Sequence, residues 1–255
     1  MNILSEIVVN EVSKSIRGVP IINSVSMTLV SGNVYGFQGI NGSGKTMLMR
    51  LICGLVYPTK GEIVIDGKRL GKEITFPQSV GLLLENPAFL DGYTGHENLE
   101  MLASIKNRIT REEIHEAIAS VGLDPLDKRK YKKFSLGMKQ RLGIAAAIME
   151  KPDILILDEP TNSLDSSGVS LVKTIIAKER ERGAIIILAC HDLPVLQDVS
   201  FDIPDGKICG VFGKSGIGKS TLAKVLCGVC PPDAGAVMLD GQTLVSADHP
   251  YDRSL

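Results

Sequence analysis

The sequence predicts an α/β fold with a mostly parallel central sheet, a small antiparallel β subdomain and a helical region. Three short apolar runs, VYGFQG, ILILDE and IIILAC, are typical of strands that are buried on both faces of a parallel sheet. Helical patterns alternate with these strands, and this order implies a doubly wound domain whose ligands bind at the carboxyl ends of the strands. The predicted helices span Thr46 to Leu55, Arg111 to Val121, Lys139 to Met149 and Gly168 to Arg182.

Two segments predict the antiparallel part. Ile7 to Val12 and Glu62 to Asp66 both carry strand-forming residues. The dipeptide Asp66-Gly67 follows the second segment and favours the tight turn of a hairpin. We therefore expect a small antiparallel flap beside the main sheet.

Length and composition narrow the class of protein. The chain has 255 residues, of which 44% are hydrophobic, so it can bury a sizeable core. Its formal net charge is -1, which gives no indication of a nucleic-acid partner or of a polybasic membrane contact. The apolar runs fall short of the roughly 18 residues that a spanning helix needs, and no signal peptide is visible at the N-terminus. These features predict a cytoplasmic protein.

The cysteines give no sign of a disulfide framework. There are five, an odd number without regular spacing, which suits a reducing compartment. Cys227 and Cys230 form a CGVC motif that could suggest redox or zinc chemistry. No second CxxC or histidine pair accompanies it, so we interpret these cysteines as packing residues.

The segment GINGSGKT fits the pattern G-x-x-x-x-G-K-[ST] and lies between an apolar strand and a helix. Glycines allow the backbone to turn sharply and to bring its N–H groups against phosphate oxygens. Lys45 would bridge the β- and γ-phosphates, and the Thr46 hydroxyl would hold Mg²⁺. This context predicts a P-loop NTPase fold that binds the phosphates of a nucleotide together with Mg²⁺. The predicted nucleotide-binding residues are Gly39, Asn41, Gly42, Ser43, Gly44, Lys45 and Thr46.

Acidic residues end the apolar strand in ILILDEPTNSLD. Asp158 and Glu159 are costly at the end of a buried strand unless they meet a cation, and we expect this strand to lie beside the strand of the loop. Asp158 would join Thr46 in the Mg²⁺ shell, and Glu159 would orient and deprotonate the attacking water. His191 ends the next apolar strand and is a candidate γ-phosphate sensor.

A second copy of the loop follows later in the chain. Residues 21 to 70 align with residues 195 to 244 without a gap, and about 16 of the 50 positions are identical, which indicates an internal repeat. The second loop, GKSGIGKST, has an equally good strand-to-helix setting. It contains a possible second phosphate site at Gly213, Gly216, Gly218, Lys219 and Ser220. No acidic pair or histidine of the required kind follows it, so we expect binding at most and not independent hydrolysis.

The stretch FSLGMKQRLGIAAAIMEKPDILILDEPTNSLD resembles the signature and Walker B region of ABC-type ATPases, with SLGMKQ in place of the usual SGGQQ. The resemblance covers residues 4 to 192 and includes a phosphate loop, Q-loop, signature, D-loop and H-loop in the expected order. It implies a helical signature subdomain, and a role for Ser135, Gly137 and Met138 in gripping the γ-phosphate of ATP on a partner subunit. It also places Asp165 in the D-loop.

Two details narrow the resemblance within the family. SLGMKQR and VGLLLENPAF, in which Glu85 replaces the glutamine of most members, are similar to ATPases of bacterial exporters for antimicrobial peptides, including lantibiotic self-protection systems. Glu85 would contact Mg²⁺ or its water and relay that state to the helical region around Asp91 to Met101, which should meet the permease. Ile16 occupies about the position where family members commonly stack an aromatic residue on adenine.

We therefore predict an ABC-type nucleotide-binding domain over residues 1 to 192, joined to the N-terminal fragment of a second such domain over residues 193 to 255. The resemblance implies the ATP-binding subunit of a transporter, which hydrolyses ATP as a homodimer or heterodimer at the cytoplasmic face of the membrane and powers a separate permease. Two alternatives remain open: an inactive or ATP-binding-only fusion product, and a soluble ABC ATPase that acts on ribosomes.

Overall fold

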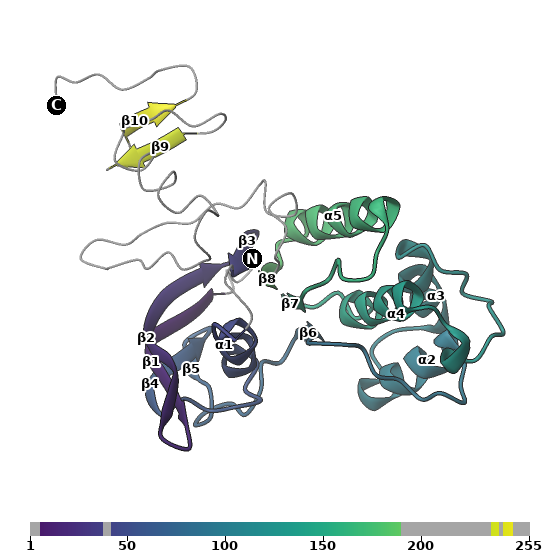
Figure 1. Ribbon diagram of the computed structural model, residues 1–255, viewed down its shortest axis with the longest axis horizontal. Helices are drawn as coiled ribbons and strands as arrows, with labels where there is room; N and C mark the ends of the chain where they lie inside the picture. The colour runs from purple at the N-terminus through teal and green to yellow at the C-terminus, as the bar shows by residue number, and fades with distance from the viewer. Residues whose placement is uncertain (1–5, 38–41, 190–235, 240–241, 247–255) are drawn as a thin grey trace. The chain divides into compact units, whose positions relative to one another are not determined.

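The computed structural model describes residues 6–37, 42–189, 236–239 and 242–246 (Figure 1). The chain divides into two compact units, Met1–Asp202 and Ile203–Leu255. The first unit contains the two larger sheets and every described helix. In the described part of the chain, no helix is both long and apolar enough to cross a membrane.

A four-stranded parallel sheet forms the centre of the first unit. Its order is β3 (Val34–Phe37), β8 (Ile185–Ala189), β7 (Ile154–Asp158) and β6 (Val80–Leu83), and each neighbouring pair is parallel. Three of these strands match the predicted apolar segments, which confirms the α/β class.

One expectation about this sheet is wrong. The strand that ends in Asp158 does not lie beside the strand of the phosphate loop, because β8 lies between β3 and β7. Every residue of β7 and β8 is buried, and such strands carry the same apolar pattern whatever their neighbours are. That pattern identifies the strands without giving their order.

A second, antiparallel sheet has the order β2 (Val19–Val30), β1 (Glu6–Ile16), β4 (Lys60–Ile65) and β5 (Lys68–Arg69). Two tight turns connect its hairpins, and both have positive φ at their two central residues. These are Arg17-Gly18, with φ of 50° and 81°, and Asp66-Gly67, with φ of 47° and 75°. The predicted antiparallel flap is thus present, with β2 as an additional long strand.

The described residues of the first unit also form five α-helices. Their bounds are α1 Lys45–Ile52, α2 Gly95–Lys106, α3 Arg111–Ser120, α4 Leu136–Ile148 and α5 Ser166–Glu181, with a short 3-10 turn at Tyr131–Lys133. Side-chain caps begin four of them: Thr94 and Thr110 form capping boxes at α2 and α3, Ser135 caps α4, and Asp165 caps α5. The signature residue Ser135 thus lies at the N-terminus of α4.

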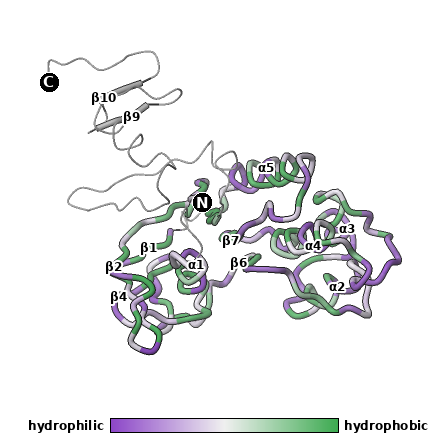
Figure 2. The backbone as a smooth tube through the Cα atoms, in the orientation of Figure 1, coloured by the Kyte–Doolittle hydropathy of each residue, from purple (hydrophilic) through white to green (hydrophobic). Residues whose placement is uncertain are grey.

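The two faces of the parallel sheet contribute to separate hydrophobic clusters. Alternate residues of β7 divide between them: Leu155 and Leu157 pack with the cluster of α2 to α5, whereas Ile154 and Ile156 pack with α1 and the antiparallel sheet. Both hydropathy colours appear along α5 in Figure 2, because it buries one side against the sheet, with Val172 among the buried residues. The sheet is therefore covered on both sides, and its carboxyl edge is left for ligands.

A histidine pair lies at the junction of α2 and α3. The rings of His96 and His115 are 4.6 Å apart, centroid to centroid, and Arg111 Nε donates a hydrogen bond of 3.1 Å to His96 Nε2. Burial, above all, lowers the pKa of His96, and His115 and Arg111 lower it further against the opposing effect of Glu100 and Glu97. The lowered pKa favours the neutral imidazole, whose Nε2 atom can accept the hydrogen bond from Arg111.

The second unit contributes one described hairpin, in which β9 (Ala236–Leu239) pairs antiparallel with β10 (Gln242–Ser246). In the repeat of the sequence these strands correspond to β4 and β5. Several predicted residues lie outside the described residues: Gly39, Asn41, His191, Cys227, Cys230, and the second-loop residues Gly213, Gly216, Gly218, Lys219 and Ser220.

Candidate functional site

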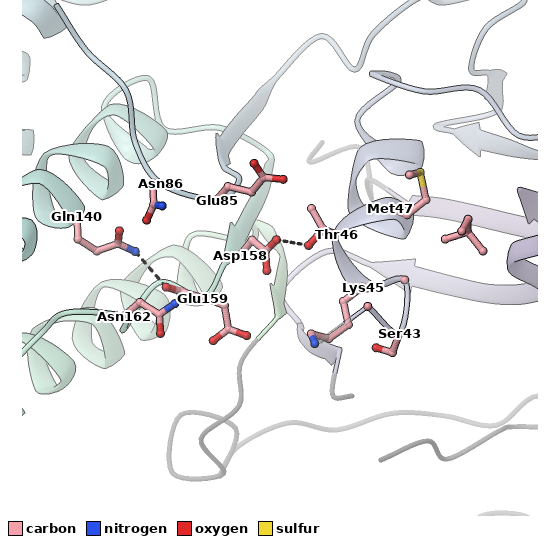
Figure 3. A pocket seen from close by; sticks show the side chains of 13 residues that line it. Ser43, Lys45, Thr46, Met47, Glu85, Asn86, Gln140, Asp158, Glu159 and Asn162 are labelled. Atoms are coloured by element: carbon pink, nitrogen blue, oxygen red, sulfur yellow. Dashed lines mark hydrogen bonds between the residues drawn. The ribbon is translucent and has the colours of Figure 1, made fainter. Parts of the chain in front are cut away.

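A cavity of about 490 Å³ opens between the start of α1 and the carboxyl ends of β6 and β7 (Figure 3). It brings together most of the described residues that the sequence predicts for nucleotide chemistry. The lining residues are Ile21, Gly42, Ser43, Gly44, Lys45, Thr46, Met47, Glu85, Asn86, Gln140, Asp158, Glu159 and Asn162.

Two glycines shape the wall formed by the loop. Gly42 and Gly44 have φ values of 81° and 97°, in the left-handed region that disfavours other residues. A Cβ on Gly44 would also lie 2.7 Å from Ile22 Cδ1. Because α1 begins at Lys45, directly after Gly44, the N–H groups of its first turn lie at the cavity. This arrangement is an anion cradle of the kind that phosphates occupy.

Thr46 and Asp158 meet at the centre of the cavity. The Thr46 hydroxyl donates a hydrogen bond to Asp158 Oδ2 at 2.5 Å, and Asp158 is only 5% exposed (Figure 3). A hydroxyl and a carboxylate oxygen are hard donors, which suit a Mg²⁺ ion that keeps several of its waters. The residues present therefore fit the predicted metal.

The backbone of Glu159 is held from two directions. Its N–H donates to the carbonyl of Ala189 in β8 at 2.8 Å, and its carbonyl accepts from Gln140 Nε2 at 3.0 Å and from the Asn162 N–H at 3.1 Å. Its φ of 48° is left-handed, which is uncommon for a residue other than glycine. In Figure 3 the side chains of Glu159 and Lys45 both point into the space between the loop and the end of β7.

Glu85 also lines the cavity, but its contact differs from the one expected. Its carboxylate Oε1 lies 2.5 Å from Arg50 Nη2 on α1, so in this structure Glu85 pairs with an arginine. The contact of Glu85 with Mg²⁺ or its water stays a prediction.

Five lining residues were not singled out from the sequence: Ile21, Met47, Asn86, Gln140 and Asn162. Gln140 has a weak signal, since it is a polar residue on a mostly buried part of α4, inside SLGMKQR. The apolar residue of the antiparallel sheet that lines the cavity is Ile21. Ile16, expected near the adenine, is 43% exposed at the end of β1 and is not among the lining residues.

The signature residues line a different cavity, of about 700 Å³. Ser135 Oγ accepts a hydrogen bond from the N–H of Met138 at 3.2 Å and so begins α4. Gly137 and Asp165 lie at the same cavity, and a Cβ on Gly137 would come within 2.9 Å of the Ser163 carbonyl. The pKa of Asp165 is lowered, mainly by the hydrogen bond from the N–H of Gly168 and further by the one from the Ser167 hydroxyl. One chain thus presents the loop and the signature at two separate cavities.

Similar proteins share both the sequence and the fold. A profile of the ABC transporter family matches residues 22–162 and 196–254. The uncharacterized ABC transporter ATP-binding protein YybJ of Bacillus subtilis (strain 168) is 46% identical over 199 residues, which are 77% of this chain and 91% of that protein. The lantibiotic transport ATP-binding protein SrtF of Streptococcus pyogenes is 34% identical over 78% of this chain and 87% of that protein.

Two further matches extend this likeness. The bacitracin transport ATP-binding protein BcrA of Enterococcus faecalis is 37% identical over 71% of this chain, which spans only 59% of that relative. A solved ATP-binding subunit of an ABC transporter matches with a TM-score of 0.66 and 26% identity, over 74% of this chain and 81% of the solved one. The chain therefore belongs to the ABC transporter ATP-binding family, whose members are ATPases.

Proposed function

We propose that this chain hydrolyses ATP as a dimer and powers a separate membrane permease. One observation carries the proposal: the glycine loop, the Thr46–Asp158 pair and Glu159 line a single cavity at the carboxyl edge of the parallel sheet. An anion cradle, a pair of hard oxygen donors and a third carboxylate are the parts that phosphoryl transfer to water requires.

Within this cavity each group has a distinct role. The N–H groups of the first turn of α1 and the Lys45 ammonium bind the phosphates of ATP. Thr46 and Asp158 hold Mg²⁺, which when bound offsets the negative charge of the phosphates. Glu159 orients the attacking water and accepts its proton, and its backbone hydrogen bonds with Ala189, Gln140 and Asn162 hold it in position. His191 is the proposed γ-phosphate sensor.

The two separate cavities support the proposed dimer. The N-terminus of α4, with Ser135 and Gly137, is a second anion site without a phosphate loop of its own. In a head-to-tail dimer this site would cover the nucleotide of the partner subunit, with Met138 and Asp165 beside it. ATP would then hold the two subunits together, and the partner could be a second copy or a related ATPase.

The transported substrate is proposed from relatives. SrtF is named for the transport of a lantibiotic and BcrA for the transport of bacitracin. Lantibiotics and bacitracin are antimicrobial peptides. We therefore propose that the permease exports an antimicrobial peptide or drug and that this chain lies peripherally on the cytoplasmic face of the membrane.

We further propose that the second loop belongs to a fragment of another domain of the same family. Two observations support it: the family profile matches again at residues 196–254, and the β9–β10 hairpin stands where the repeat places β4 and β5. Residues 203–255 contain no counterpart of Asp158 and Glu159. We propose that hydrolysis depends on the first loop alone.

The experiment is an ATPase assay of the full chain with Lys45→Ala and Lys219→Ala as matched variants. We expect Lys45→Ala to abolish turnover and Lys219→Ala to change the rate little. A comparable fall in both variants would contradict a single complete site, and an inactive wild-type chain would favour the ATP-binding-only fusion. Co-purification with ribosomes in place of a permease would favour the soluble alternative.

A further inference from the structure

Arg50 makes an ion pair at the edge of the cavity that no family motif accounts for. It lies on α1, one helical turn after Thr46, and its Nη2 atom is 2.5 Å from Glu85 Oε1. Residues four apart lie on the same face of a helix. One face of α1 therefore carries Thr46, which bonds Asp158, and Arg50, which bonds Glu85.

The two acceptors lie at the ends of neighbouring strands, Asp158 as the last residue of β7 and Glu85 two residues after β6. β6 and β7 pair in parallel register, Leu83 opposite Leu157, and Asp158 and Glu85 come shortly after these residues. Both therefore lie at the carboxyl edge of the sheet, where the cavity opens. The helix that begins at the phosphate loop is thus linked to the ends of both strands.

The conformation of Glu85 needs such a restraint. Its φ is 60°, in the left-handed region that costs energy for a residue with a side chain, and the chain leaves β6 here on its way to α2. Glu85 also lines the cavity together with two other carboxylates, Asp158 and Glu159. The ion pair with Arg50 gives the Glu85 side chain a defined direction at this wall.

Stability alone does not explain the pair. The side chains of Arg50 and Glu85 are 37% and 62% exposed, and ion pairs of this exposure add little to folding stability. Arg50 is not among the residues that line the cavity, so it acts on the site through Glu85.

We propose that Arg50 is a positioning residue that holds the Glu85 carboxylate at the cavity wall. This role rests on the proposed function, since it assigns Glu85 a part in ATP turnover. It is specific to a chain with glutamate here, because the neutral glutamine that most members of the family carry would not form the ion pair.

The test is a double-mutant cycle of Arg50→Gln and Glu85→Gln, with kcat and KM for ATP measured on the full chain in saturating Mg²⁺. We expect each single variant to lower kcat by about tenfold, because the carboxylate is misplaced or lost, with KM changed by less than about twofold. Since both changes remove the same arrangement, the double variant should match Glu85→Gln alone. Arg50→Lys, which keeps the charge, should recover part of kcat.

The control is Arg69→Gln. Arg69 lies in β5 of the antiparallel sheet, and the change breaks its ion pairs with Glu62 and Glu73. This variant should leave kcat unchanged. Independent, multiplicative losses in the cycle would overturn the positioning role, and so would an unchanged kcat in Arg50→Gln. If Arg50→Gln does not fold, Arg50→Lys in the presence and absence of Glu85→Gln gives the same comparison. An inactive wild-type chain would contradict the proposed function instead, so the two failures are distinguishable.

Discussion

Replacing Gln140 with methionine removes the hydrogen bond from α4 to the main-chain carbonyl of Glu159 while keeping the length of the side chain. Gln140 is 5% exposed, and its Nε2 atom donates to the Glu159 carbonyl at 3.0 Å. In the variant this carbonyl keeps its hydrogen bond from the Asn162 N–H at 3.1 Å but loses the one from Gln140, which costs about 0.5–1.5 kcal/mol of the free energy of unfolding. We expect the transition midpoint in urea to fall accordingly.

The same change should also slow turnover. Glu159 has a left-handed φ of 48°, and Gln140 holds its backbone together with Ala189 and Asn162. A shift of about 1 Å in the carboxylate that orients water can lower kcat by about 10²-fold. Because Gln140 also lines the cavity, its removal could alter ATP binding, so KM is measured with kcat.

Tyr131→Phe is the matched control. The Tyr131 hydroxyl donates to the carbonyl of Pro87 at 2.7 Å, so the variant also removes one hydrogen bond to a partly buried main-chain carbonyl. Urea denaturation and steady-state ATPase kinetics are measured for both variants. We expect similar losses of stability and a fall in kcat only for Gln140→Met. An equal kcat in the two variants would refute the positioning of Glu159 by α4.

Three further predictions concern the metal, the pH dependence and the packing. Thr46→Val should raise the Mg²⁺ concentration needed for half-maximal ATPase activity by at least about tenfold, measured by titrating Mg²⁺ in the assay, whereas Thr46→Ser should leave it unchanged. The pKa of His96 lies below the ordinary value of 6.5, so the unfolded chain takes up this proton at a higher pH than the folded chain does. The free energy of unfolding should therefore decrease as the pH falls below 6.5. His96→Gln should flatten this pH dependence between pH 7.5 and 5.5. Gly81→Ala should lower the free energy of unfolding by about 1–3 kcal/mol or more, because its Cβ would lie against the Ala147 carbonyl, whereas Gly92→Ala, with open space around its Cβ, should be nearly neutral in denaturation.

The fold could be predicted where a local pattern carries it. Continuous apolar runs identified β3, β7 and β8, and Asp66-Gly67 identified the β4–β5 hairpin. The strand β2 was missed because bulges in its pairing with β1 interrupt the regular alternation of residues. The order of β3, β8 and β7 depends on long-range pairing between strands of one composition, which no local pattern encodes.

The candidate site divides in the same way. The loop glycines, Lys45 and Thr46 are contiguous, and Asp158 and Glu159 end one strand, so spacing alone identified them. Gln140 and Arg50 act through partners that are 19 and 35 positions away, and their roles depend on the packing of α4 and α1. Such contacts become visible only when the helices are placed.

The most direct test of the central claim is turnover and association of Glu159→Gln in ATP and Mg²⁺, measured by an ATPase assay and by light scattering. The account predicts that this variant binds ATP as the wild type does, loses nearly all hydrolysis, and accumulates as a dimer. Hydrolysis at the wild-type rate would contradict the assignment of Glu159 as the general base of the one complete site.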